Sequence, residues 1–267
     1  YGLSKRAVDT AAAEGVTLIV TADIGVRDHV TVSHAKSLGI DVIVVDHHLP
    51  AGEAVPVDAV AVLCPPQAGC PYPNKALAAC GVSFKLASAL LADDARRDDY
   101  LDSMLKLAAI GTVADVVDLA NAENRAIVTL GLRALNRGPH SPGLTALLKV
   151  ASANIGAITS ESLGWRIGPR INAAGRLADA SAVVRLLRER DPNAALAQAA
   201  GLDELNRERQ DIQEDLVEAA LARIPDPLPS FLVLSGTEEE GFHRGGVGIV
   251  ATSIDDVANV LREQERV

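Results

Sequence analysis

The chain has 267 residues, 48% of them hydrophobic, which is enough for one large domain with a buried core and part of another. Its formal net charge of -10 excludes a broadly basic surface for nucleic acid, because such binding depends on Lys and Arg side chains that neutralise phosphates. Any contact with nucleic acid must therefore come from a local group of cations.

The three cysteines, Cys64, Cys70 and Cys80, match no common zinc-binding spacing. We interpret them as small buried or turn residues. The sequence shows no signal peptide and no apolar run of about 18 residues, the length that a membrane span requires. We therefore expect a cytoplasmic protein that makes no membrane contact.

The first part of the chain alternates strand-like and helix-like segments. Residues 16–21 and 40–45 are β-branched runs that predict strands, and residues 27–38 between them predict a helix that ends at Gly39. Because this helix is a crossover connection, the two strands are expected to run parallel. A further apolar run, residues 60–63, leads into a proline-rich loop. This alternation is typical of an α/β fold with a parallel sheet.

The rest of the chain is predicted to be largely helical. Apolar residues recur at helical spacing in four segments, and a fifth segment, rich in Glu, Arg, Gln and Leu, predicts a long exposed helix. The five segments are residues 76–91, 100–110, 124–135, 144–150 and 203–224.

Ionisable side chains follow both predicted strands. Asp46, His47 and His48 come directly after the second strand, and Asp23 follows the first. Ligands of an open parallel sheet bind at the carboxyl ends of its strands, so these residues are expected to face one crevice. An Asp beside two His can bind a divalent cation, orient one imidazole and leave the other for a phosphate oxygen. For the tripeptide alone, a solvated loop is an equal explanation.

A third acid, Asp115, stands in an apolar stretch between Ala114 and Val116, where surface charge is a poor explanation. We expect Gly111 and Thr112 to break the preceding helix and to place Asp115 just after it. The alternative is that Thr112 and Asp115 form a capping pair at the start of a short helix.

Together with the segment Gly168–Arg176, these stretches resemble the DHH phosphoesterase superfamily in order and spacing, and within it the bacterial single-strand-specific exonucleases. The resemblance implies an N-terminally incomplete DHH domain over residues 1–194, with flanking helices. It also implies a long connecting helix over residues 195–224 and the start of a partial second α/β domain, the DHH-associated domain, over residues 225–267. Further matching segments are residues 69–73, 81–86, 205–210 and 242–250.

The resemblance implies metal-dependent phosphodiester hydrolysis, with 5′-to-3′ exonuclease activity on single-stranded DNA in recombination and repair. Two Mn²⁺ or Mg²⁺ ions are the implied cofactors. Asp23 would bridge the ions, and His47 and Asp115 would bind one of them. Asp46 would hold a neighbouring group and His48 would face the scissile phosphate. A structural hydrogen bond within the loop is the alternative for His48.

Five further residues are implied to contact substrate. Arg170, Asn172 and Arg176 lie in a Gly- and Ala-rich segment that permits close approach of a ligand, and guanidinium groups suit phosphate oxygens. Packing between helices with salt bridges is the alternative for the two arginines. His243 and Arg244 precede two glycines and are candidates for a phosphate-binding turn.

Two departures from the superfamily pattern qualify this expectation. Nothing before Asp23 can serve as the upstream Asp-x-Asp motif, and the chain stops early in the DHH-associated domain. We therefore expect a fragment that is poorly active alone.

Two alternatives remain open: a DHH-family phosphodiesterase that acts on short oligonucleotides or cyclic dinucleotides, and a non-catalytic DHH remnant that serves as a binding module. The sequence does not reveal whether the protein has protein partners.

Overall fold

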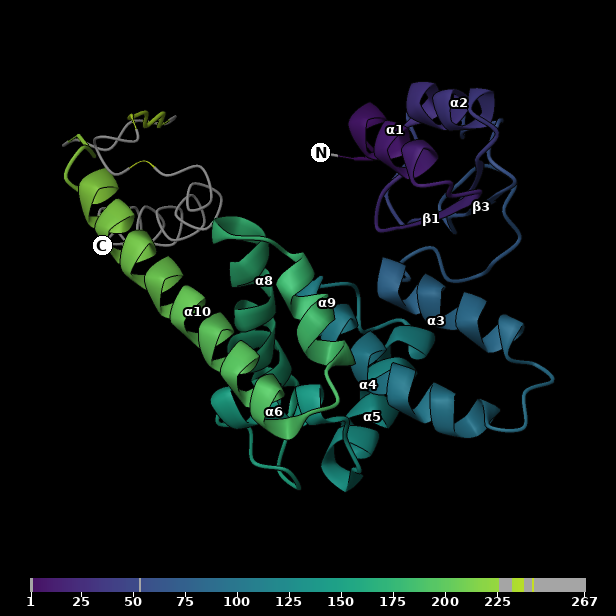
Figure 1. The fold of residues 1–267 in the computed structure, drawn as a ribbon. Helices are drawn as coiled ribbons and strands as arrows, with labels where there is room; N and C mark the ends of the chain where they lie inside the picture. The colour runs from purple at the N-terminus through teal and green to yellow at the C-terminus, as the bar shows by residue number, and fades with distance from the viewer. Residues whose placement is uncertain (1, 53, 226–231, 238–241, 243–267) are drawn as a thin grey trace. The chain divides into compact units, whose positions relative to one another are not determined.

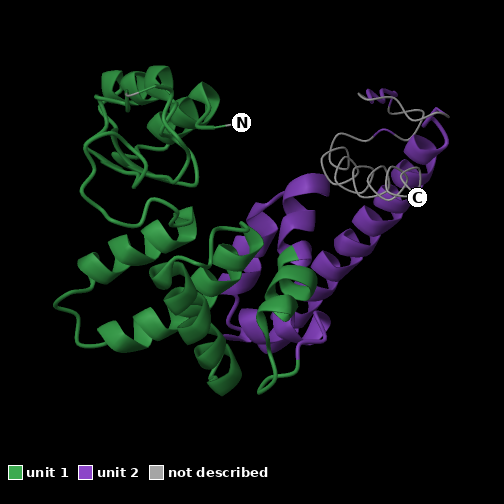
Figure 2. Ribbon diagram, turned by 180° about the vertical axis from the view of Figure 1, so that it is seen from behind, with its two compact units in different colours: residues 1–140, 154–168 green, residues 141–153, 169–267 purple. Residues whose placement is uncertain are grey.

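The computed structural model describes residues 2–52, 54–225, 232–237 and 242 (Figure 1). The contacts divide the chain into two compact units (Figure 2). No helix of the described part is both long and apolar enough to cross a membrane. The domain boundaries expected from the resemblance stay a prediction. The first unit contains residues 1–140 and 154–168, and the second contains residues 141–153 and 169–267.

A parallel three-stranded sheet forms the start of the first unit, which confirms the predicted α/β fold. The strands lie in the order β1-β2-β3, and a helix, α2, connects the first two as predicted. The register pairs the last residue of β1 with the last residues of β2 and β3, so the three strands end at the same level. The bounds are Leu18–Ala22 for β1, His29–Ser37 for α2, Asp41–Val45 for β2 and Ala61–Leu63 for β3.

The two faces of the sheet contribute to two separate hydrophobic cores, because successive strand residues point to opposite faces. Val42 and Val44 of β2 pack with Val32 of α2 and with Val8 of α1, which spans Lys5–Ala13. Val45, which points to the other face, belongs to a second core with residues of the helices that follow. These two cores hold the strand ends in place from both sides.

The helical part of the first unit follows the sheet. Its two longest helices, α4 and α5, pack against each other, and α3 packs on α4. A single π-helical turn, η1, contacts α4 and carries Trp165, whose residue surface is 79% exposed. The bounds are Ala79–Leu90 for α3, Arg97–Ala114 for α4, Ala122–Arg137 for α5, Ser160–Ser162 for α7 and Leu163–Ile167 for η1.

We expect Gly131→Ala to destabilise the first unit, because α4 and α5 approach too closely at this point to admit a side chain. A Cβ on Gly131 would lie 2.3 Å from the Cβ of Ala109 and 2.7 Å from the carbonyl oxygen of Leu105. Overpacking of this kind costs about 1–3 kcal/mol. Thermal unfolding measures the loss. Gly201→Ala is the matched control, because no atom lies within 4 Å of its added Cβ and alanine favours the helix. Equal melting temperatures of Gly131→Ala and Gly201→Ala would contradict the close packing of α4 against α5.

The second unit contains α6, α8, α9 and α10. The long helix begins at Pro192, earlier than residue 203, where the residue pattern predicted its start, and earlier than residue 195, which the resemblance implied. Asp191 caps it by accepting hydrogen bonds from the backbone N–H groups of Asn193 and Ala194. Most of the expected second α/β domain lies outside the described residues. The bounds are Pro142–Val150 for α6, Gly168–Leu177 for α8, Ser181–Arg188 for α9 and Pro192–Leu221 for α10.

Candidate functional site

The loop after β1, residues 23–28, carries the first predicted site residue. Asp23 has a positive φ of 66°, which few residue types other than Gly, Asn and Asp adopt readily, and its backbone N–H donates to the carbonyl of Val45. Gly25 completes the turn at φ 115°, where a Cβ would lie 2.8 Å from the hydroxyl of Thr21. The carboxylate of Asp23 is therefore held at the strand ends, with its side chain 63% exposed.

The loop after β2, residues 46–50, is organised by Asp46. The Asp46 carboxylate is 2% exposed and accepts hydrogen bonds from the backbone N–H groups of Val26 at 3.0 Å, His47 at 2.7 Å and His48 at 3.1 Å. Burial disfavours its charged form, but these bonds and one from the His48 ring outweigh that effect and lower the pKa of Asp46. One carboxylate thus joins the two loops.

His47 lies between two carboxylates. Its Nε2 is 3.1 Å from Oδ1 of Asp23, and its Nδ1 is 3.5 Å from Oδ2 of Asp115. The hydrogen bond with Asp23 raises the pKa of His47, burial opposes this, and the charge of Asp115 adds to the rise. Burial also raises the pKa of Asp115, although the neighbouring His47 opposes that change. The three predicted metal-binding residues therefore do come together, from β1, β2 and α4.

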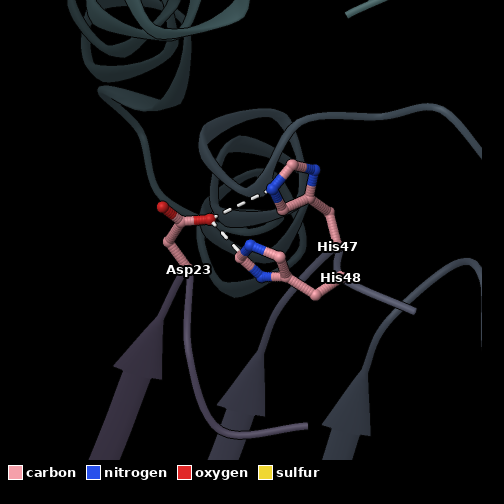
Figure 3. A group of neighbouring side chains, drawn as sticks. All are labelled: Asp23, His47 and His48. Atoms are coloured by element: carbon pink, nitrogen blue, oxygen red, sulfur yellow. Dashed lines mark ion pairs between the residues drawn. The ribbon is translucent and has the colours of Figure 1, made fainter. Parts of the chain in front are cut away.

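His48 is oriented differently from His47. Its Nδ1 is 2.7 Å from Oδ1 of Asp46, which leaves Nε2 as the nitrogen available to a ligand, and the side chain is 47% exposed. Figure 3 shows both imidazoles beside Asp23 at the ends of the strands, with ligand atoms of Asp23, His47 and His48 all within 4.8 Å of one another. Both histidines are thus close enough to Asp23 to share a ligand with it.

Asp115 reaches the site from the C-terminal end of α4, and the predicted break of this helix at Gly111 and Thr112 is wrong. Helix α4 continues through Gly111 and Thr112 to Ala114, and Asp115 caps its C-terminal end with an N–H that donates to the carbonyl of Gly111. The predicted break is absent because Gly111 is a packing residue: its Cβ would lie 2.7 Å from the sulfur of Cys80 in α3. The alternative, capping at the start of a short helix, is also wrong.

The thiol of Cys64, the residue that follows β3, contacts the loop after β2. It is buried and donates to the carbonyl of His48 at 3.3 Å. Burial raises the pKa of the Cys64 thiol to about 11, so it stays protonated and is a poor metal ligand at neutral pH. All three cysteines are free, and each is buried or partly buried, as predicted.

The predicted substrate-binding residues belong to the second unit. The guanidinium of Arg170 donates through Nε to Oδ1 of Asp203 at 2.8 Å, so packing between α8 and α10 occupies part of this side chain. Asn172 and Arg176 are exposed. Their predicted role in substrate binding stays a prediction. His243 and Arg244 lie outside the described residues.

Arg27 is a candidate that the sequence analysis did not identify. Its Nε donates to the carbonyl oxygen of Leu49 at 2.8 Å, one residue beyond His48. The only signal in the sequence was an arginine four residues after Asp23, and nothing local indicated that its side chain reaches the next loop.

A family model described as the DHH family, N-terminal domain, matches residues 3–112. The single-stranded-DNA-specific exonuclease RecJ of Salmonella typhimurium is 41% identical over 96% of this chain, and that of Bacillus subtilis is 40% identical over 96%. This chain belongs to the DHH family. It spans 46% and 31% of the length of these two relatives.

Solved RecJ structures agree with this assignment. A crystal structure of exonuclease RecJ bound to manganese has a TM-score of 0.78 at 31% identity and covers 95% of this chain and 62% of that one. RecJ of Thermus thermophilus in complex with Mn²⁺ has a TM-score of 0.78 at 32% identity and covers 95% of this chain and 37% of that one. The DHH-family fold therefore extends well beyond the segment that the family model matches.

Proposed function

We propose that the protein carrying this chain hydrolyses phosphodiester bonds of single-stranded DNA with the help of Mn²⁺ or Mg²⁺. The observation that carries the proposal is His47 between Asp23 and Asp115, where three elements end. The RecJ relatives, named as single-stranded-DNA-specific exonucleases, support this substrate. The 5′-to-3′ direction and the role in recombination and repair rest on the family resemblance.

In this proposal Asp23, His47 and Asp115 would be the metal ligands, and Asp23 would serve both ions. Carboxylate oxygens and one imidazole nitrogen suit Mn²⁺ and also accept Mg²⁺, so the donor set fits the proposed cofactors. Bound divalent ions supply a nucleophile at neutral pH and relieve charge on the phosphoryl oxygens. The raised pKa of His47 belongs to the metal-free arrangement, in which the imidazole is hydrogen-bonded to Asp23.

Asp46 and His48 are proposed to act on the substrate side. Asp46 fixes the loop after β2 and takes a hydrogen bond from Nδ1 of His48, so the ring is held with Nε2 directed away from Asp46. A protonated His48 in that orientation would stabilise negative charge that develops on the phosphoryl group. Arg170, Asn172 and Arg176 are proposed to contact the DNA strand.

The test uses the whole protein that carries this chain and measures hydrolysis of one labelled DNA sequence as a single strand and as a duplex, beside a trinucleotide and a cyclic dinucleotide, in Mn²⁺, Mg²⁺ or EDTA. We expect nucleotide release from the long single strand in either metal and none in EDTA. Faster hydrolysis of the trinucleotide or cyclic dinucleotide would favour the alternative DHH-family phosphodiesterase. Binding of DNA without hydrolysis in any metal would favour the non-catalytic module. The cytoplasmic location stays a prediction.

A further inference from the structure

The candidate site is strongly acidic for a site that must receive a phosphate. The carboxylates of Asp23, Asp46 and Asp115 all lie around the two histidines. Until metal neutralises them, these charges repel a nucleic-acid backbone. A cation placed at the rim of the site would oppose this repulsion and hold the strand in position.

Arg27 is such a cation. Its loop is bound to the histidine-bearing loop at two points: the N–H of Val26 donates to Asp46 at 3.0 Å, and the guanidinium of Arg27 donates to the carbonyl of Leu49 at 2.8 Å. Leu49 directly follows His48, and consecutive Cα atoms are about 3.8 Å apart, so the carbonyl that Arg27 contacts lies close to His48. The guanidinium is thereby anchored beside the site.

The bond to Leu49 uses one of the five N–H donors of the Arg27 guanidinium. Among the described residues, no carboxylate forms an ion pair with Arg27, whereas Arg137 is paired with Asp102. The side chain is exposed. Its charge is therefore not neutralised by the part of the protein that the structure describes, and the planar fork that remains matches two phosphate oxygens.

We propose that Arg27 binds a phosphate of the DNA strand next to the phosphate that the candidate metal site holds. This inference rests on the proposed function. It adds a residue from the loop after β1 that positions the strand without binding metal. The alternative is that Arg27 only fastens the two loops together, which would require its hydrogen bond but not its charge.

The salt dependence of binding separates these two roles. Fluorescein-labelled oligothymidylate is titrated with the protein in EDTA at KCl concentrations of about 50–200 mM. Arg27→Gln keeps an amide donor for the Leu49 carbonyl and removes the charge. We expect it to weaken binding about tenfold and to reduce the slope of log K against log salt by about 0.7, the value for one phosphate contact on a single strand. Its melting temperature should stay that of the wild type.

Arg137→Gln is the matched control, because it removes an arginine that Asp102 already neutralises. Its slope should equal that of the wild type. An unchanged slope in Arg27→Gln, beside salt-dependent binding by the wild type, would overturn the inference about Arg27 alone. Absence of binding by the wild type in EDTA would overturn the inference, and the proposed function would fall with it only if the protein also released no nucleotide in Mn²⁺ or Mg²⁺. If Arg27→Ala has a lower melting temperature than the wild type while Arg27→Gln keeps the wild-type salt slope, the role of Arg27 is only to hold the two loops together.

Discussion

In the whole protein that carries this chain, replacement of His48 by alanine is expected to lower kcat for single-stranded DNA by about 10²-fold or more, with little change in the affinity for Mn²⁺. The reason is that Nδ1 of His48 is bound to Asp46, so the ring is placed to contact the phosphoryl group rather than to complete a metal site. His47→Ala should instead weaken Mn²⁺ binding, by more than about 10²-fold, because His47 lies between Asp23 and Asp115. Single-turnover hydrolysis and calorimetric titration with Mn²⁺ measure the two effects.

The two neighbouring histidines are controls for each other, since both substitutions remove an imidazole from the same loop. Melting temperatures of both variants show whether the loop is intact. Nδ1 of His48 is also 4.0 Å from Asp23, so a metal-binding role for His48 is the competing assignment. Loss of Mn²⁺ affinity in His48→Ala, with affinity retained in His47→Ala, would exchange the two roles.

Asp46→Ala is expected to lower the free energy of unfolding by about 3 kcal/mol, since a buried donor left without a partner costs about 1–3 kcal/mol and the other bonds to the carboxylate are also lost. Val26, one of the donors, is 1% exposed, so water cannot replace the lost bond at its N–H. Activity should fall with stability, because the ring of His48 loses its anchor. Chemical denaturation and hydrolysis assays measure the two losses.

Asp41→Ala is the control for Asp46→Ala, because Asp41 is an exposed acid at the start of the same strand, β2. We expect it to unfold like the wild type. The free energy of unfolding of Asp46→Asn should lie between those of Asp46→Ala and Asp41→Ala. Its amide oxygen still accepts one set of hydrogen bonds, while its NH₂ group faces a donor. If Asp46→Ala and Asp41→Ala unfold at the same denaturant concentration, Asp46 does not organise the two loops.

The positions of the strand ends could be predicted because they depend on local sequence. The β-branched runs define β1 and β2, and the crossover helix between them leaves only a parallel arrangement. The convergence of Asp23 and His47 follows directly from that topology. The start of α10 also depends on local sequence, because Asp191 is its N-cap and Pro192 its first residue.

The features that could not be predicted depend on contacts between distant segments. Gly111 looks like a helix breaker in sequence, but its place against Cys80 makes it a packing residue inside α4. The role of Asp46 as acceptor for Val26 requires the fold to bring the two loops together. The same is true of the bond from Arg27 to the carbonyl of Leu49.

The exposed indole of Trp165 on η1 can serve as an intrinsic fluorescence probe of this chain. Trp165 is the single tryptophan of the chain and is 79% exposed, so fluorescence excited selectively at tryptophan comes from one side chain in water. The added Cβ of its neighbour Gly164 would lie 3.5 Å from Val113 in the last turn of α4, two residues before Asp115. Emission from this chain therefore reports on the surroundings of that helix end. Anything that covers η1 should shift the emission to shorter wavelength, without any attached dye.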